Sequence, residues 1–387
     1  MIIKKQYKPN FRFYFLLFLI VLFLIFVISG GLYFLVTTKT ERDLKKLQYN
    51  KEAISLIIDK KLDKYLINNN LYSKTLEVAL VNNLYEDNLL EEYLYFSYKD
   101  YDNYIEQLNE LNIIGYQRSD IEQVFKILSE EEINTIINKK TMIDNLASYI
   151  NNDYFNINAI DRYIDYKKIN DSYDYDKVIS HVNMLLDYPH YEHTIDVTKP
   201  NDLLVIVNKY YKLSKDFVPK DLVRIDTKYA VDNDRWVIPV VKENFEKMAS
   251  DMRKLGLTIQ AKSAYRSYQT QVILYDNYVK ASGKTAADTF SARAGYSEHQ
   301  TGLAVDVRAG TGNYGTFAQS DEHDWMAKNA HTYGFILRYP ENKTNITGYK
   351  FESWHFRYVG KDVAKYIYEN DLTFDEYYAM TIASKKD

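Results

Sequence analysis

One short stretch of the chain places a histidine near an acidic residue in a pattern that could hold a metal ion. His299 precedes a turn at Gly302, and Asp306 follows inside the apolar run 303–307. A carboxylate in such a strand-like run is costly to bury unless it is paired or bound to a cation. The stretch therefore indicates a buried polar site rather than a plain core strand.

A second stretch holds Glu352 and His355, three residues apart. Extended backbone would point these two side chains to opposite faces, whereas a bend or bulge would bring both to one site. Together with the first stretch, His299, Asp306 and His355 form a His/Asp/His set. Zinc suits such a set, because catalytic zinc has three protein ligands and an open fourth position. Glu352 would then take a proton from the attacking water.

The remaining histidines and the absence of cysteine narrow the choice of possible metal ligands and nucleophiles. The chain has no cysteine, which excludes disulfides, thiolate ligands and cysteine nucleophiles. The other five histidines lack an acidic partner in a predicted strand, and we interpret them as structural or exposed. His190 and His193, three residues apart, leave a surface metal contact open as an alternative.

If the metal activates a water molecule for attack on a carbonyl group, a cation is also needed near that carbonyl. Arg266 follows the predicted strand 257–263, which places it at a strand end. Its guanidinium could stabilise the oxyanion of a tetrahedral intermediate or hold a substrate carboxylate. Without the neighbouring motifs, a surface ion pair would be the simpler interpretation.

The elements that position these residues are predicted from periodicity and from the distribution of glycine and proline, most of which lie in the last half of the chain. There the pattern predicts an α+β fold: a small, mostly antiparallel sheet with packed helices. The predicted strands are residues 203–208, 257–263, 303–307 and 351–358. The predicted helices are residues 239–255, 268–281, 324–333 and 362–369.

Glycine and proline are almost absent from residues 40–160. This composition predicts an α-helical spacer or stalk built from short helical hairpins. Apolar positions from Ala53 to Leu66 fall on one helix face. Ser119 is predicted to cap a helix that continues through Leu128. The hairpins resemble degenerate repeats. The alternative to a spacer without chemistry is a module that binds glycan or a partner protein.

Residues 13–36 form an apolar run without charge that predicts a transmembrane helix, since a bilayer core needs roughly 20 such residues. Residues 1–12 would be a cytoplasmic tail, and the protein would cross the cell membrane once with the remainder of the chain, including the predicted metal site, outside the cytoplasm. The positive charges on the two sides of the run nearly balance, so this orientation depends on the interpretation of the predicted site as that of an exported protein. A cleaved signal peptide ending near Ser29 is the alternative. The net charge of −4 gives no basic bias, so no nucleic-acid partner is expected.

Three blocks of the sequence resemble the VanY-type D-alanyl-D-alanine carboxypeptidases in order and approximate spacing. The blocks are 263–267 (SAYRS), 297–306 (SEHQTGLAVD) and 352–360 (ESWHFRYVG). The resemblance extends from about Tyr163 to the C-terminus, and it implies a zinc carboxypeptidase domain over residues 161–387. Ala294 and Ser353 depart from the family, which often has proline at both places.

The resemblance implies a role for each matching residue. Zinc would lie on His299, Asp306 and His355, with Glu352 as general base and acid and Arg266 at the oxyanion. It further implies that Ser297 lines the site and contacts the substrate, and that Tyr265 and Gln271 are pocket residues.

The expected reaction is zinc-dependent removal of the terminal D-Ala from peptidoglycan stem peptides. An L,D-carboxypeptidase and a cell-wall endopeptidase are alternatives on the same scaffold. A non-catalytic wall-binding protein is the alternative of another class, although intact Glu352 and Arg266 argue against it.

Overall fold

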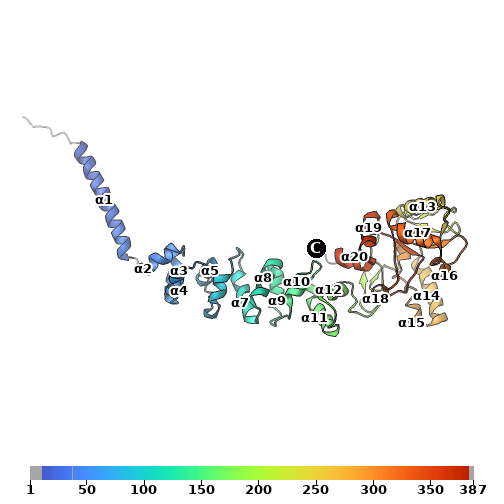
Figure 1. Cartoon of the computed structure of the whole chain (residues 1–387), viewed down its shortest axis with the longest axis horizontal. Coiled ribbons are helices and arrows are strands. Elements are labelled where there is room, and N and C mark those ends of the chain that lie inside the picture. The colour runs from blue at the N-terminus through green and yellow to red at the C-terminus, as the bar shows by residue number, and fades with distance from the viewer. Residues whose placement is uncertain (1–10, 37, 383–387) are drawn as a thin grey trace, which may run out of the picture. The chain divides into compact units, whose positions relative to one another are not determined.

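The computed structural model describes residues 11–36 and 38–382. The chain divides into two compact units, Met1–Ile150 and Asn151–Asp387, which are described separately. Figure 1 shows the element order by colour. The predicted domain boundaries at residues 40–160 and 161–387 stay a prediction.

The first unit begins with α1 (Phe11–Val36), whose side chains from Tyr14 to Val27 are exposed. Within the described residues, no helix has both the length and the apolar character needed to cross a membrane. The predicted transmembrane helix at residues 13–36 is therefore not supported. Residues 1–10 of the predicted cytoplasmic tail lie outside the described residues.

The rest of the first unit is helical, as predicted. Its α-helices are α2 (Lys39–Lys46), α3 (Lys51–Asp59), α4 (Asp63–Asn68), α5 (Lys74–Val81), α6 (Leu90–Tyr95), α7 (Tyr104–Ile114), α8 (Arg118–Ile127), α9 (Glu130–Ile137) and α10 (Leu146–Ile150), with the 3-10 helix η1 (Asp87–Leu89) before α6. The predicted face from Ala53 to Leu66 is divided between α3 and α4, because Lys61 adopts a positive φ of 60°. Ser119 is not the N-cap of α8, since Gln117 takes that position.

Side chains link helices of this unit that lie about one hairpin apart in the sequence. The Gln107 amide donates to the Asn134 side chain at 2.9 Å, and Arg118 forms an ion pair with Glu92 at 2.7 Å. Buried Tyr93 accepts a hydrogen bond from the backbone of Glu86. These contacts tie successive hairpins into one array. The function of this spacer stays a prediction.

The second unit combines helices with three small sheets. Its helical elements are η2 (Ile157–Ala159), α11 (Ile160–Ile169), α12 (Tyr175–Asn183), α13 (Pro239–Lys254), α14 (Tyr268–Ser282), α15 (Lys284–Ala287), η3 (Glu298–Thr301), α16 (Tyr314–Phe317), α17 (Asp321–Asn329), η4 (Ala330–Tyr333), α18 (Thr344–Thr347), α19 (Lys361–Glu369) and α20 (Phe374–Thr381). Its strands are β1 (Ile195–Asp196), β2 (Tyr211–Lys212), β3 (Val223–Arg224), β4 (Trp236–Val237), β5 (Ile259–Ser263), β6 (Ala304–Ala309), β7 (Phe335–Leu337) and β8 (His355–Tyr358). The predicted α+β class is confirmed for this unit.

The main sheet has the strand order β5-β6-β8-β7, and all its pairs are antiparallel. Asp306 of β6 lies opposite Ser263 on one side and opposite His355 on the other. The register shifts between Ala261 and Ser263, next to this row. Three strands thus bring one row of polar residues together across the sheet.

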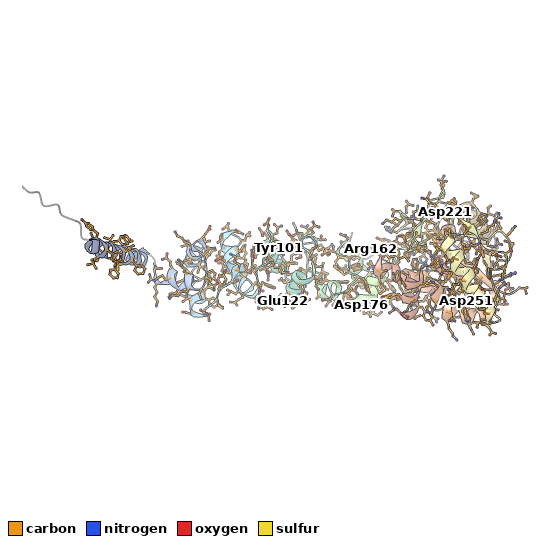
Figure 2. All side chains as sticks on the ribbon, turned by 90° about the horizontal axis from the view of Figure 1, so that it is seen from above. Tyr101, Glu122, Arg162, Asp176, Asp221 and Asp251 are labelled. Atoms are coloured by element: carbon orange, nitrogen blue, oxygen red, sulfur yellow. The ribbon has the colours of Figure 1, made fainter. Side chains whose placement is uncertain are left out.

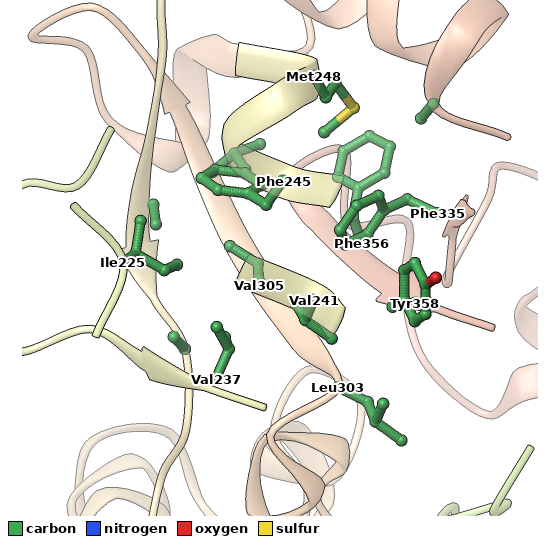
Figure 3. Close-up of a cluster of buried hydrophobic side chains, with 14 of the residues drawn as sticks. Ile225, Val237, Val241, Phe245, Met248, Leu303, Val305, Phe335, Phe356 and Tyr358 are labelled. Atoms are coloured by element: carbon green, nitrogen blue, oxygen red, sulfur yellow. The ribbon is translucent and has the colours of Figure 1, made fainter. Parts of the chain in front are cut away.

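The helix α13 packs on this sheet and buries its apolar side. Pro239 opens the helix at its first turn, where a missing N–H costs nothing. Figure 3 shows Phe245 and Met248 beside Phe335 and Phe356 of the sheet, and all four are buried. This apolar core therefore fixes the positions of the strands that carry Asp306 and His355.

The predicted strand at residues 203–208 is wrong, because this segment is irregular although Val205 and Val207 are buried. The carbonyls of Leu203 and Val205 accept hydrogen bonds from the buried Arg357 side chain, at 3.0 and 2.8 Å. A guanidinium thus satisfies backbone groups that a strand ladder would otherwise pair.

Candidate zinc site

Three buried side chains of the second unit meet at one point. His299, Asp306 and His355 each offer a ligand atom, and these atoms all lie within 4.8 Å of one another. The His299 Nε2 is 3.2 Å from one Asp306 oxygen, and the His355 Nδ1 is 2.9 Å from the other. The structure therefore brings together the three residues for which the sequence predicts zinc.

A tight turn delivers His299 and Asp306 to this point. The 3-10 helix η3 ends at Gly302, which has a φ of +69°, and β6 begins two residues later. The His299 Nδ1 lies 2.7 Å from the carbonyl of Ala264. A ring nitrogen beside a carbonyl carries the proton, which leaves Nε2 as the free ligand atom.

The charges of this cluster depend on one another. Burial lowers the pKa of His299, which favours its neutral ring. Burial alone would raise the pKa of Asp306, but the two histidines hold it well below its usual range. Burial would also lower the pKa of His355, whereas the neighbouring carboxylates of Asp306 and Glu298 raise it to about 9. In the absence of metal, the cluster is stabilised by a proton on His355, and a bound cation would take the place of that proton.

Glu352 reaches the same point because the chain turns before β8. The predicted strand 351–358 is shorter than expected and begins only at His355, whose N–H donates to the Glu352 carbonyl across the turn at 3.2 Å. The Glu352 carboxylate lies 4.0 Å from the His355 Nδ1. Burial raises the pKa of Glu352 to about 7. A carboxyl with such a pKa is suited to accept and return a proton near neutral pH.

Arg266 follows β5 and lies beside the cluster. Its Nη1 donates to the Gln271 side chain at 2.7 Å, and its Nη2 donates to the Ser263 hydroxyl at 2.9 Å. The same Nη2 is 3.9 Å from an Asp306 oxygen. Gln271 is buried and donates in turn to the carbonyl of Ala292 at 2.7 Å. The guanidinium is thus fixed before any substrate arrives.

A cavity of about 480 Å³ opens beside these residues. Ser297, Arg266, Gln271 and Glu352 line it together with the three predicted ligands. Tyr265 is not part of this lining, so its prediction as a pocket residue is not supported. Its backbone N–H donates to the Trp236 carbonyl at 2.7 Å, which fixes Tyr265 at the turn after β5.

Sequence reasoning missed two groups of residues at this site. One is the aromatic wall of the cavity, formed by Tyr278, Phe290, Tyr314, Tyr339, Tyr349 and Trp354. These residues lie in several segments and share no spacing that could have revealed them. The other is Glu298, which lies next to His299 and is fully buried. Its position inside the second sequence block was the available signal.

The other histidines lie elsewhere. His193 stacks on Tyr188 at 4.1 Å between ring centroids, and His331 stacks on Tyr368 at 3.9 Å. The His181 Nδ1 lies 3.0 Å from the Tyr166 hydroxyl. In the part of the chain that the structure describes, neither His190 nor His193 belongs to a group that could hold a metal ion.

Comparison with known proteins agrees with this geometry. Residues 234–361 match the sequence model of the VanY family, described as D-alanyl-D-alanine carboxypeptidase. The chain is similar to the carboxypeptidase YodJ of Bacillus subtilis (strain 168), with 38% identity over 47% of this chain and 69% of that protein. It is also similar to the bifunctional D-Ala-D-Ala dipeptidase and D-Ala-D-Ala carboxypeptidase VanXYC of Enterococcus gallinarum, with 35% identity over 45% of this chain and 93% of that protein.

Among solved structures, the structure of the chain is similar to that of the LdcB LD-carboxypeptidase. The two are 38% identical over 48% of this chain and 89% of that one, with a TM-score of 0.46.

Proposed function

Because the chain belongs to the VanY family of D-alanyl-D-alanine carboxypeptidases, we propose that it removes the terminal D-alanine from peptidoglycan stem peptides with the help of zinc. One observation carries the proposal. His299, Asp306 and His355 converge beside a cavity that Glu352 and Arg266 also line.

The side chains at this point fit zinc by their chemistry. Two imidazoles and one carboxylate are a donor set that zinc accepts, and the absence of cysteine leaves no softer ligand. His299 would bind through Nε2, and His355 through Nδ1. When bound, zinc supplies Lewis acidity that polarises a carbonyl and makes a water molecule more acidic.

Glu352 moves the proton in this proposal. As a carboxylate it takes a proton from the water that attacks the carbonyl of the penultimate residue. It then gives that proton to the nitrogen of the departing D-alanine, so that the C–N bond breaks to an amine. Burial keeps its pKa near 7, which suits both steps. No covalent bond between enzyme and substrate is required.

Arg266 stabilises the negative charge that develops on the carbonyl oxygen. Its two hydrogen bonds, to Gln271 and Ser263, hold the guanidinium in place. A preorganised cation of this kind costs no reorganisation when the charge appears. Ser297 is buried and lines the same cavity, where it would contact the substrate peptide.

The test uses purified full chain in detergent, incubated with synthetic pentapeptide stems, tetrapeptide stems and cross-linked stem peptides, with and without a chelator. Mass spectrometry follows the release of D-alanine. Chelator-sensitive loss of one D-alanine from the pentapeptide is expected. Trimming of the tetrapeptide alone would reassign the protein as an L,D-carboxypeptidase. Cleavage only of cross-linked peptides would indicate an endopeptidase. Zinc binding without any hydrolysis would favour a wall-binding protein.

We also propose that the protein is held at the cell membrane by its N-terminal segment, with the catalytic unit outside the cytoplasm. Two observations support this. Residues 13–36 are apolar and uncharged, and the described side chains from Tyr14 to Val27 are exposed. Exposed apolar surface of this extent is unfavourable in water. Cell fractionation tests the proposal: extraction by detergent but not by high salt is expected, and release by salt would contradict it.

A further inference from the structure

Glu298 is a fully buried carboxylate that the proposed reaction does not use. Its Oε1 accepts hydrogen bonds from Arg338 at 2.7 Å and from Arg357 at 3.0 Å. Its Oε2 faces the Nε2 of His355 at 3.5 Å. Among the described residues, neither of these two atoms has a hydrogen-bond partner. The carboxylate therefore lies between two arginines and the back of one predicted zinc ligand.

The contacts continue from Arg338 to the helix α20. Arg338 Nη1 donates to Asp375 Oδ2 at 2.5 Å, and Nη2 donates to Asp375 Oδ1 at 3.3 Å. Asn208 donates to the same Oδ1 at 2.8 Å. Arg338 has no exposed side-chain surface, and Asp375 has almost none. A continuous path of polar contacts thus runs from Asp375 to His355.

Stability alone is a poor explanation for this path. Charges removed from water carry a desolvation cost that their mutual attraction often does not exceed, and apolar residues of similar volume can replace them without loss. Glu298 lies within ion-pair distance of the guanidinium groups of both Arg338 and Arg357, at 2.7 and 3.0 Å. Glu298 is therefore a carboxylate whose Oε1 accepts two hydrogen bonds and whose Oε2 is left for the Nε2 of His355.

Such an acceptor is what a histidine ligand requires. His355 presents Nδ1 to the cluster, so the proton of a neutral ring must lie on Nε2. A carboxylate beside that N–H fixes the tautomer and the ring orientation and makes the ring a stronger donor. The Oε2 of Glu298 lies where it can do so.

We propose that Glu298 and Asp375 are positioning residues for zinc binding: Asp375 holds Arg338, Arg338 holds Glu298, and Glu298 orients His355. The helix α20 thereby becomes a structural part of the zinc site. The proposal rests on His355 being a zinc ligand.

The test compares zinc affinity in full-chain variants Glu298→Gln and Asp375→Asn by competition with a chromogenic chelator. We expect zinc to bind Glu298→Gln roughly 10- to 100-fold more weakly, and Asp375→Asn about 10-fold more weakly, as is typical for residues behind a ligand. The absorption spectrum of the cobalt-substituted protein should shift in both, because the geometry around His355 changes. These readouts do not depend on activity.

A matched control is Asp187→Asn, which breaks the ion pair of Arg162 (labelled in Figure 2) with Asp187 at 2.6 Å in the same unit. This control should lower Tm but leave zinc affinity and the cobalt spectrum unchanged. Equal zinc affinity in Asp375→Asn and wild type would overturn the path through Arg338. Equal zinc affinity in Glu298→Gln and wild type would overturn the proposal as a whole.

Failure of the proposed function would look different, since it would show in the wild-type protein as absence of zinc binding or of hydrolysis. If the wild-type protein did not bind zinc, both proposals would be overturned. If it bound zinc without hydrolysing peptide, the measured zinc affinities of the variants would still decide the proposal on Glu298 and Asp375. Glu298→Gln leaves two buried guanidinium groups with one carboxylate fewer. If Glu298→Gln does not fold, Asp375→Asn decides the outcome. This variant should fold, because the side-chain oxygen of the asparagine can still accept a hydrogen bond from Arg338.

Discussion

The carboxylate of Glu352 lies 4.0 Å from the Nδ1 of His355, although the two residues are only three positions apart at the start of a strand. A turn through Ser353 and Trp354 makes this possible. The proton-transferring group and one predicted zinc ligand are therefore held by the same few residues.

Glu352→Gln should abolish turnover while zinc binding remains. The amide has nearly the same shape but cannot accept the proton of the attacking water, and general acid–base catalysis typically contributes 10²- to 10⁴-fold in rate. We expect kcat for D-alanine release from the pentapeptide to fall by about that factor. Zinc content per chain is measured in parallel. A variant that keeps wild-type kcat would remove Glu352 from the mechanism.

Arg266→Lys should slow the reaction although the positive charge is kept. Lysine cannot make both the Gln271 and the Ser263 contact that fix the guanidinium. We expect kcat/KM to fall by about 10²-fold, the usual loss for one oxyanion donor. The control is Arg308→Lys on β6, whose guanidinium bonds to Gln260 instead. Similar losses in both variants would mean that Arg266 acts only through the fold.

The stability of the metal-free protein should depend on pH through Glu352. The folded pKa of about 7 lies above the ordinary value of 4.5, so the stabilisation is complete below pH 4.5 and is lost as pH rises through 7. The loss amounts to about 3 kcal/mol at most. Glu352→Gln has no such loss, and its Tm relative to wild type should rise between pH 5 and pH 8. A difference in Tm that stays constant over this range would refute the shift.

Asp306→Asn should remove zinc-dependent stabilisation. Saturating zinc at 1,000 times its Kd would stabilise the wild-type protein by about 4 kcal/mol, and the variant should gain almost nothing. Thermal unfolding with and without zinc measures this, and activity should be lost on chelation and restored by zinc. Asp324→Asn is the control, because Asp324 also lies beside a histidine, at 3.5 Å, but outside the cluster. Equal zinc effects in Asp306→Asn and wild type would exclude Asp306 as a ligand.

Gly302→Ala should destabilise the protein more than Gly256→Ala. Both glycines have positive φ, +69° and +82°, so both variants carry the backbone cost of about 1 kcal/mol or more. A Cβ at Gly302 would also lie 3.1 Å from Leu222 and 3.3 Å from Ile238, whereas Gly256 has open space. The extra crowding should cost about 1–3 kcal/mol. Urea unfolding of the two variants measures the difference, and equal losses would contradict the crowding.

The sequence predicted those parts of the site that local patterns encode. Asp306 is predictable because a charged residue inside an apolar run is rare without a reason, and His299 and His355 because one precedes the turn at Gly302 and the other follows Glu352 by three residues. Periodicity predicts α13, α14 and α19 closely. What it could not predict depends on contacts between distant segments.

Two examples show this. Residues 203–208 have the composition of a strand, but Arg357 satisfies their carbonyls from 152 or more positions away. Glu298 likewise lies beside His355 only in the folded sheet. Local periodicity contains no record of such pairings. The prediction of Tyr265 as a pocket residue rests instead on the resemblance of residues 263–267 to the VanY family.

The row formed by Ser263, Asp306 and His355 across β5, β6 and β8 has a consequence for how the chain folds. A slip of β8 by one residue would place Trp354 or Phe356 opposite Asp306 and turn His355 to the other face of the sheet. Such a misaligned sheet would lack a complete ligand set and gain no stabilisation from the metal. Bound zinc would therefore stabilise only the sheet in which the three strands have their native register.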